Sequence, residues 1–121
     1  MSKIYLAIPY SGLEEESFAV VNKIAAKLMA EGHIVFSPIS HTHPIALAGD
    51  LPKGWDYWKK FDETFIDWCE ILYIVVMKNQ GFERIRDSVG VNAEHVMALN
   101  QGKRILHVDE EMILKEEGWL E

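Results

Sequence analysis

The sequence predicts an α/β domain in which helices cover both faces of a mostly parallel sheet of four to five strands. Short apolar runs alternate with longer segments whose apolar residues recur every three or four positions. One run, Ile71 to Met77, is apolar throughout, which is typical of a central strand buried on both faces. The alternation favours a doubly wound class, flavodoxin-like or Rossmann-like. A length of 121 residues suits one domain, so we expect residues 1–121 to form a single unit.

The first third of the chain predicts a strand, a helix and a second strand. Lys3 to Ile8 is a short apolar run that ends in the turn Pro9 to Gly12. From Leu13 to Glu31 the apolar residues fall on one helical face. Ile34 to Phe36 is apolar again and ends before Pro38. We therefore expect two parallel strands joined by a crossover helix.

The middle of the chain contains a segment, Ser37 to Trp55, that is rich in proline and glycine. It predicts a long loop, either functional or mobile, that could contain one helical turn at Ile45 to Ala48. Asp56 to Glu70 then predicts a helix, because aromatic and aliphatic residues make up most of one face.

The last third predicts a loop, a helix, a strand and a final helix. Lys78 to Asp87 is polar, and Val89 to Asn100 has a helical pattern that Ser88 can cap with its hydroxyl. Arg104 to Val108 is the last predicted parallel strand. Asp109 to Glu121 predicts a short acidic helix followed by a tail.

The composition limits the partners that the protein can bind. The formal net charge of −7 argues against a nucleic-acid polymer or a membrane surface as the main partner. Cys69 is the only cysteine, which excludes an intrachain disulfide and a cysteine-rich metal site. No apolar run approaches the length of a membrane span, and the N-terminus lacks the charged-then-apolar pattern of a signal peptide. We therefore expect a cytoplasmic protein.

The candidate site is predicted where three loops meet, because ligands of doubly wound sheets bind beyond the carboxyl ends of the strands. The helix that starts after Ser88 offers unpaired N–H groups to an anion, and Gly90 lets a ligand approach the backbone. Glu94 follows within about the first two turns of this helix. A carboxylate there is favourable in itself. Alternatively, Glu94 performs chemistry on a ligand that Ser88 and Gly90 hold.

Asp62 is the candidate partner of that carboxylate. Two carboxyl groups in different environments can divide nucleophilic attack and proton transfer at a glycosidic bond. The ordinary alternative is a solvated helix residue among Asp56, Glu63 and Asp67. Tyr5, inside the first strand, is either a core aromatic or a hydroxyl that reaches a catalytic carboxylate.

Two histidines in the predicted loop, His41 and His43, raise the possibility of a metal pair, since side chains two residues apart share a side in an extended segment. No third ligand is obvious, because Cys69 and His95 lie in helical patterns, so we expect no metal and no cofactor. Trp55 could stack on a base or belong to the core. The absence of a G-x-G-x-x-G or Walker pattern argues against a dinucleotide dehydrogenase or an NTPase.

Several segments in a fixed order resemble a known family. Tyr5 to Ser11 (Y-L-A-I-P-Y-S) is similar to the N-terminal Y-L-A-G-P signature of the nucleoside 2-deoxyribosyltransferase-like superfamily, and Val35 to Ile39 resembles its second strand. Asp62 matches the position of a family aspartate, and Ser88 to Glu94 matches the S-x-G-V-x-x-E motif of the nucleotide N-glycosidase branch. His41 to Pro44 resembles a small uncharacterised bacterial and phage subgroup.

The resemblance implies cleavage or transfer at the N-glycosidic bond of a nucleoside or nucleoside 5′-monophosphate. Glu94 would be the nucleophile, Asp62 would assist the leaving base or orient the sugar, and Tyr5 would position Glu94. Ser88 and Gly90 would hold the 5′ end of the ligand. The other expected substrate contacts are Pro9, Tyr10, Ser11, His43 and Trp55. The resemblance also implies a homodimer or larger homo-oligomer.

Two departures from the family pattern concern the ligand. Ile8 occupies the position of the family's usual glycine, and the loop after the first strand lacks the arginine of the nucleotide-hydrolase branch. Arg84 and Arg86 are candidate replacements. The choice between nucleoside and monophosphate, the base, the sugar, and hydrolysis versus transfer stay open. A non-catalytic nucleotide-binding or sensing module, or a metal-dependent hydrolase using His41 and His43, are the alternatives.

Overall fold

The computed structural model describes residues 1–52, 54–77, 81–111 and 114–116, and it contains one five-stranded sheet with the order β2-β1-β3-β4-β5. The strands are β1 (Lys3–Ala7), β2 (Ile34–Phe36), β3 (Ile71–Val76), β4 (Arg104–Asp109) and β5 (Leu114–Glu116). The first four run parallel, and β5 is antiparallel to β4. This sheet confirms the predicted mostly parallel α/β class.

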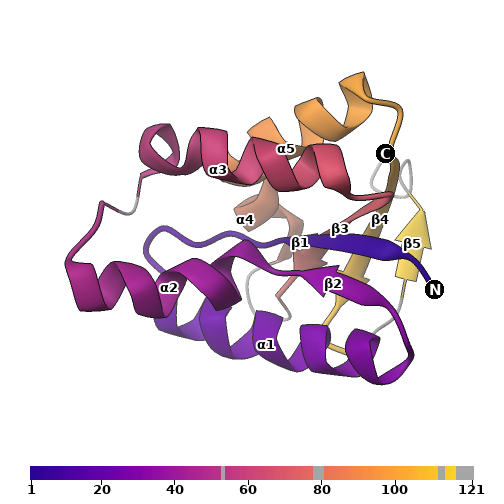
Figure 1. Ribbon diagram of the computed structural model, residues 1–121, viewed down its shortest axis with the longest axis horizontal. Helices are drawn as coiled ribbons and strands as arrows, with labels where there is room; N and C mark the ends of the chain where they lie inside the picture. Colours follow the sequence, from indigo (N-terminus) through magenta and orange to yellow (C-terminus); the bar gives the residue numbers. More distant parts are fainter. Residues whose placement is uncertain (53, 78–80, 112–113, 117–121) are drawn as a thin grey trace.

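Helices pack on both faces of the sheet. They are α1 (Glu14–Ala30), α2 (Pro38–Gly49), α3 (Trp55–Trp68), α4 (Gly81–Arg86) and α5 (Val89–Asn100). Figure 1 shows α1 below the sheet, α3 and α5 above it, and α2 at the left, beyond the end of β2. None of the helices in the described ranges combines the length and apolarity needed to cross a membrane.

Alternation along β1 decides which side chains reach which layer. Ile4 and Leu6 belong to the apolar cluster with α1, whereas Tyr5 and Ala7 belong to the cluster with α3, α4 and α5. Successive side chains of a strand point to opposite faces, so every second residue of β1 meets the same helices. Tyr5 therefore points toward the layer that contains Glu94.

The prediction of a long loop between Ser37 and Trp55 is wrong over most of its length, because Pro38–Gly49 forms α2. Ser37 is the N-cap, and its hydroxyl accepts a hydrogen bond from the N–H of Ser40 at 3.4 Å. Pro38 occupies the start of the helix, where the missing N–H of proline would have no intrahelical partner anyway. The serine–proline pair is thus a helix start signal, not a loop signal.

Two other predictions, for the segments that follow β3 and β4, are wrong. Leu114–Glu116 is strand β5 instead of part of an acidic helix, because the edge of β4 offers unpaired backbone groups that a neighbouring segment can join. Gly81–Arg86, predicted as loop, is the short helix α4. Residues 78–80, 112–113 and 117–121 of these predicted segments lie outside the described residues.

Candidate active site

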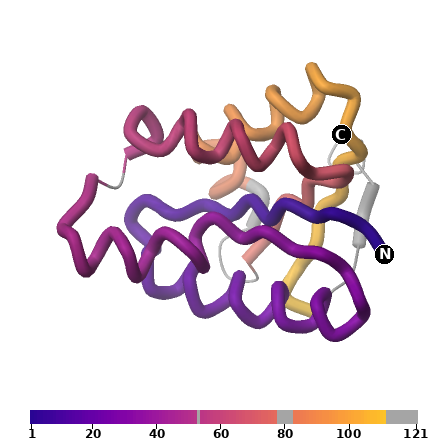
Figure 2. The backbone as a smooth tube through the Cα atoms, in the orientation of Figure 1, coloured from indigo at the N-terminus to yellow at the C-terminus, as the bar shows by residue number. Residues whose placement is uncertain are grey.

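A cavity of about 450 Å³ opens at the carboxyl end of the sheet. Its walls come from Ile8 to Ser11 after β1, from Pro38 and Ile39 after β2, and from the starts of α3 and α5. Figure 2 shows the turn after β1 and the start of α3 at the same end of the sheet. The volume is within the range of small-molecule sites, and the position agrees with the crevice expected for a doubly wound sheet.

Glu94 and Tyr5 form a buried polar contact at this site. Glu94 lies on the second turn of α5, lines the cavity and is 5% exposed. The hydroxyl of Tyr5 donates a hydrogen bond to Glu94 Oε2. Tyr5 is fully buried and does not line the cavity, so it contacts the carboxylate from the sheet side.

Asp62 lines the cavity from α3 and interacts electrostatically with Glu94. Burial raises the pKa of Glu94 well above its usual range, the Asp62 carboxylate raises it further, and the hydrogen bond from Tyr5 opposes both effects. Burial also raises the pKa of Asp62 to about 7, against the opposing hydrogen bond with Tyr5. The two carboxyl groups therefore interact as a pair, in which the charge of Asp62 disfavours the ionisation of Glu94.

The start of α5 forms another wall. Ser88 is the N-cap, and its hydroxyl accepts a hydrogen bond from the N–H of Val91 at 3.3 Å, as its sequence position predicts. Gly90 lies against Trp55, since a Cβ atom at Gly90 would be 3.5 Å from Cε3 of that indole. Ser88, Gly90 and Trp55 all line the cavity.

The loop after β1 places Pro9, Tyr10 and Ser11 at the cavity. Its two ends are held by side chains from other elements. The fully buried Ser17 of α1 donates a hydrogen bond to the carbonyl of Pro9, and the Arg84 guanidinium donates one to the carbonyl of Ser11. These contacts fix the backbone on both sides of Tyr10.

The charges around the cavity are mostly negative. Asp56, Asp62, Asp87 and Glu94 line it, whereas Arg84 is the single basic lining residue within the described parts of the chain. Arg86, the other arginine considered as a replacement, is exposed and lies beside Asp87, with 3.5 Å between Nε and Oδ1. Of the two candidates, only Arg84 lines the cavity.

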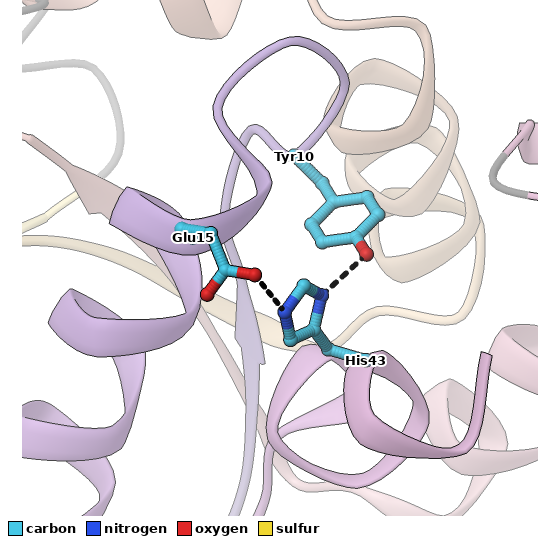
Figure 3. Close-up of polar contacts among 3 residues, drawn as sticks. All are labelled: Tyr10, Glu15 and His43. Carbon is cyan, nitrogen blue, oxygen red and sulfur yellow. Dashed lines mark hydrogen bonds and ion pairs between the residues drawn. The ribbon is translucent and has the colours of Figure 1, made fainter. Parts of the chain in front are cut away.

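His43 is a buried residue of α2 that does not line the cavity, so the structure does not place this predicted substrate contact in the wall. Figure 3 shows its imidazole between Tyr10 and Glu15. The Tyr10 hydroxyl lies 2.7 Å from Nδ1, and Nε2 lies 3.1 Å from Oε1 of Glu15. His43 therefore contacts the site through Tyr10.

The two histidines of α2 diverge because residues two apart lie about 200° apart around a helix. His41 stacks on Phe61 with ring centroids 5.9 Å apart, whereas the His43 ring lies 4.6 Å from that of Phe18. The two histidines therefore do not form the extended pair that was raised as a possibility. Over the described residues, no group of three or more His, Cys, Asp or Glu side chains is arranged to hold a metal ion.

Polar residues around the site that the sequence does not single out include Glu15, Thr42, Asp56 and Asp87. Thr42 lines the cavity and donates a hydrogen bond from its hydroxyl to the carbonyl of Pro38 at 2.8 Å. Recognition of Ser37 and Pro38 as a helix start would have placed Thr42 one turn above Pro38 on the same face. Glu15 carries no comparable signal, because an acidic first turn is ordinary in a helix.

Comparisons with known proteins give a family and several structural relatives. The model of the family described as "Domain of unknown function (DUF1937)" matches residues 2–110. No curated protein sequence matches the chain significantly. A 2-deoxyribosyltransferase from the psychrotolerant bacterium Bacillus psychrosaccharolyticus is similar with a TM-score of 0.62 and 28% identity, over 89% of this chain and 72% of that one. A 2-desoxiribosyltransferase from Leishmania mexicana has the same fold, with a TM-score of 0.61 and 15% identity over 90% of this chain and 65% of that one.

Proposed function

This chain belongs to the family described as domain of unknown function DUF1937 and to the nucleoside 2-deoxyribosyltransferase-like superfamily, and we propose that it transfers the sugar of a nucleoside from one base to another. The observation that carries the proposal is the buried Glu94, which lines the cavity together with Asp62, interacts electrostatically with it and accepts a hydrogen bond from Tyr5. The similar Bacillus protein is described as a biocatalyst for the synthesis of nucleosides, which supports a nucleoside as the ligand.

In the first step, the Glu94 carboxylate attacks C1′ of the sugar while the N-glycosidic bond breaks. The electron pair of that bond goes to the base nitrogen, and Asp62 donates a proton to the leaving base. The hydrogen bond that Tyr5 donates to Glu94 Oε2 stabilises the charged form of Glu94, and the proposed step places the shared proton of the pair on Asp62. The product is a glycosyl ester of Glu94.

In the second step, a nitrogen of another base attacks C1′ and breaks the ester. Glu94 leaves as a carboxylate, and Asp62 accepts the proton that the incoming base loses. Water can replace the second base, in which case the same residues perform hydrolysis. Because burial raises the pKa of Asp62 to about 7, this residue can donate and accept a proton near neutral pH.

The charge of the cavity supports a nucleoside in preference to a nucleoside 5′-monophosphate. A phosphate dianion would face four carboxyl groups and one guanidinium among the described lining residues. Arg84 already donates a hydrogen bond to the Ser11 carbonyl. The N–H groups at the start of α5 can instead receive the 5′-hydroxyl, which brings no charge.

The test is base release and exchange. Purified protein is incubated with ribo- and deoxyribonucleosides and their 5′-monophosphates, with and without a second free base, and the products are separated by chromatography. We expect exchange with nucleosides, and a loss of about 10⁴-fold or more in rate for Glu94→Gln. The glutamine retains an oxygen that can accept the Tyr5 hydrogen bond, so the fold should be kept.

The matched control is Glu83→Gln, which changes an exposed glutamate of α4 that does not line the cavity. If the base is released but no second base is incorporated, the sugar is transferred to water and the protein is a hydrolase instead of a transferase. Binding of a nucleoside without any release or exchange would contradict the enzyme and favour a sensing module.

A further inference from the structure

A chain of three side chains runs from solvent to the cavity wall: Glu15 of α1, His43 of α2 and Tyr10 of the loop after β1. Glu15 is 80% exposed, His43 is 3% exposed, and Tyr10 lines the cavity. Figure 3 shows the imidazole between the carboxylate and the phenol. Neither Glu15 nor His43 lines the cavity, so they can affect a ligand only by orienting the Tyr10 hydroxyl.

The donors and acceptors in this series of hydrogen bonds follow from Glu15, the residue exposed to solvent. A carboxylate in water at neutral pH only accepts hydrogen bonds, so the His43 nitrogen beside Glu15, Nε2, carries the proton. In a neutral imidazole the other nitrogen is then an acceptor. Nδ1 lies 2.7 Å from the Tyr10 hydroxyl, which therefore donates its proton toward His43.

A Tyr10 hydroxyl that donates its proton to His43 has only lone pairs left for a further partner, such as a ligand in the cavity that Tyr10 lines. Burial, followed by the nearby carboxylates of Glu14 and Glu15, raises the pKa of Tyr10, so the phenol keeps the proton that it donates. The Phe18 ring, 4.6 Å from the imidazole, limits rotation of the His43 side chain. The hydrogen bond from Arg84 to the Ser11 carbonyl holds the backbone next to Tyr10. These contacts therefore leave the phenolic oxygen of Tyr10 as a hydrogen-bond acceptor held in one orientation.

We propose that Tyr10 determines base specificity, because its phenolic oxygen accepts a hydrogen bond from an exocyclic amino group of the base. Adenine and cytosine carry such a donor where hypoxanthine and uracil carry an oxygen acceptor. Glu15 and His43 are the positioning residues. This inference rests on the proposed function, and it adds the class of base that the site selects.

The position of Tyr10 supports contact with the base. C1′ must lie against Glu94, which Tyr5 contacts at the level of the sheet, and the proposed seat of the 5′-hydroxyl is the start of α5. Tyr10 lies five residues beyond Tyr5, outside the end of β1. In a nucleoside bound with C1′ against Glu94 and the 5′-hydroxyl at the start of α5, the edge of the base is the part farthest from C1′. This edge can therefore reach the loop after β1, which contains Tyr10.

The experiment compares two nucleoside pairs, 2′-deoxyadenosine with 2′-deoxyinosine and 2′-deoxycytidine with 2′-deoxyuridine. Both members of a pair compete in one tube, and chromatography gives the ratio of their kcat/KM values. The bases of a pair differ as leaving groups, so the informative quantity is the change of this ratio on substitution. We expect Tyr10→Phe to lower the amino-to-oxo ratio by about tenfold in both pairs.

Glu15→Ala should lower the same ratio by a smaller factor, because His43 can then exchange its tautomer and reverse the bond to Tyr10. Glu16→Ala is the matched control, since it removes a neighbouring charge from the same first turn of α1 and should leave the ratio unchanged. A role of Glu15 in folding alone would lower the rates of all four nucleosides together without changing their ratios.

An unchanged or increased amino-to-oxo ratio in Tyr10→Phe overturns the inference while Glu94-dependent turnover keeps the proposed function intact. If the wild-type protein turns over none of the four nucleosides, the proposed function fails, and the ratio is measured as equilibrium affinity instead. Equal loss of affinity for both members of each pair, or no binding at all, then overturns base selection as well.

Discussion

Two tyrosines that lie five residues apart in the sequence form hydrogen bonds of different consequence. Tyr5 is fully buried and donates to Glu94, a carboxylate that is itself 5% exposed. Tyr10 lines the cavity and bonds to His43, whose other nitrogen contacts a Glu15 side chain that is 80% exposed.

The difference is one of solvent. In the buried pair, the low dielectric makes the charge of the carboxylate costly, so the hydrogen bond changes its ionisation. In the series Glu15, His43 and Tyr10, water screens the charge of Glu15. The hydrogen bonds of this series therefore mainly set the orientation of the Tyr10 hydroxyl. Substitutions at the two places should therefore differ in kind as well as in size.

The largest effect within this comparison is expected for Asp62→Asn. Asparagine cannot transfer the proton to the leaving base, so kcat should fall by about 10²- to 10⁴-fold. Steady-state rates measure this loss, with Glu63→Gln, exposed on the same helix, as the control. A nucleoside analogue whose leaving group needs no proton should recover most of the rate; no recovery would mean that Asp62 only orients the sugar.

The next effect concerns stability. The folded-state pKa of Asp62 is about 7 and lies above the ordinary value of 3.8, so the folded protein binds the proton more tightly than the unfolded chain. The resulting stability is present below the ordinary value and is lost as pH rises toward about 7. Asp62→Asn should therefore lose less free energy of unfolding than wild type between about pH 4 and about pH 8.

Urea unfolding at the two pH values measures this difference, which we expect to reach a few kcal/mol. Glu63→Gln should follow the wild-type curve. Parallel curves for wild type and Asp62→Asn would contradict the raised pKa.

A smaller effect is expected for Tyr5→Phe. Without the donor, the pKa of Glu94 rises further, because the hydrogen bond from Tyr5 lowers it. The ionised nucleophile then becomes available only at higher pH, so the acidic limb of the pH–rate profile should move upward and kcat should fall by about 10- to 100-fold. Tyr73→Phe, on the other face of the sheet, is the control, and a profile that loses height without moving would argue against this role of Tyr5.

The smallest effect is expected for the stability of Glu15→Ala. The pair of His43 and Glu15 has one exposed partner, so its loss should change the free energy of unfolding by no more than about 1 kcal/mol. Thermal and urea unfolding measure the change. A loss of several kcal/mol would make Glu15 a structural residue and would remove the contrast with the buried pair.

Local patterns were sufficient for much of the fold. The apolar runs of β1 and β3 and the helical periodicity of α1 and α5 are set by neighbouring residues, and the structure agrees with them to within a few residues. Ser88 was identifiable as a cap because capping acts over three residues. The prolines of α2 favour a loop when the sequence is considered alone, whereas in the structure Pro38 starts the helix.

Local sequence patterns are enough to predict a serine-capped helix that carries a carboxylate in its second turn beside a parallel sheet, since both periodicities depend on neighbouring residues. The groups that meet this carboxylate depend on how the layers pack. The contact of Tyr5 with Glu94 spans 89 positions and depends on which face of β1 packs against α5. Asp62 lines the cavity and the neighbouring Glu63 is exposed because the packing of α3 turns one residue inward and the next outward. Burial raises the pKa values of Asp62 and Glu94. Burial depends on the packing of the layers, so no short segment of the sequence determines it.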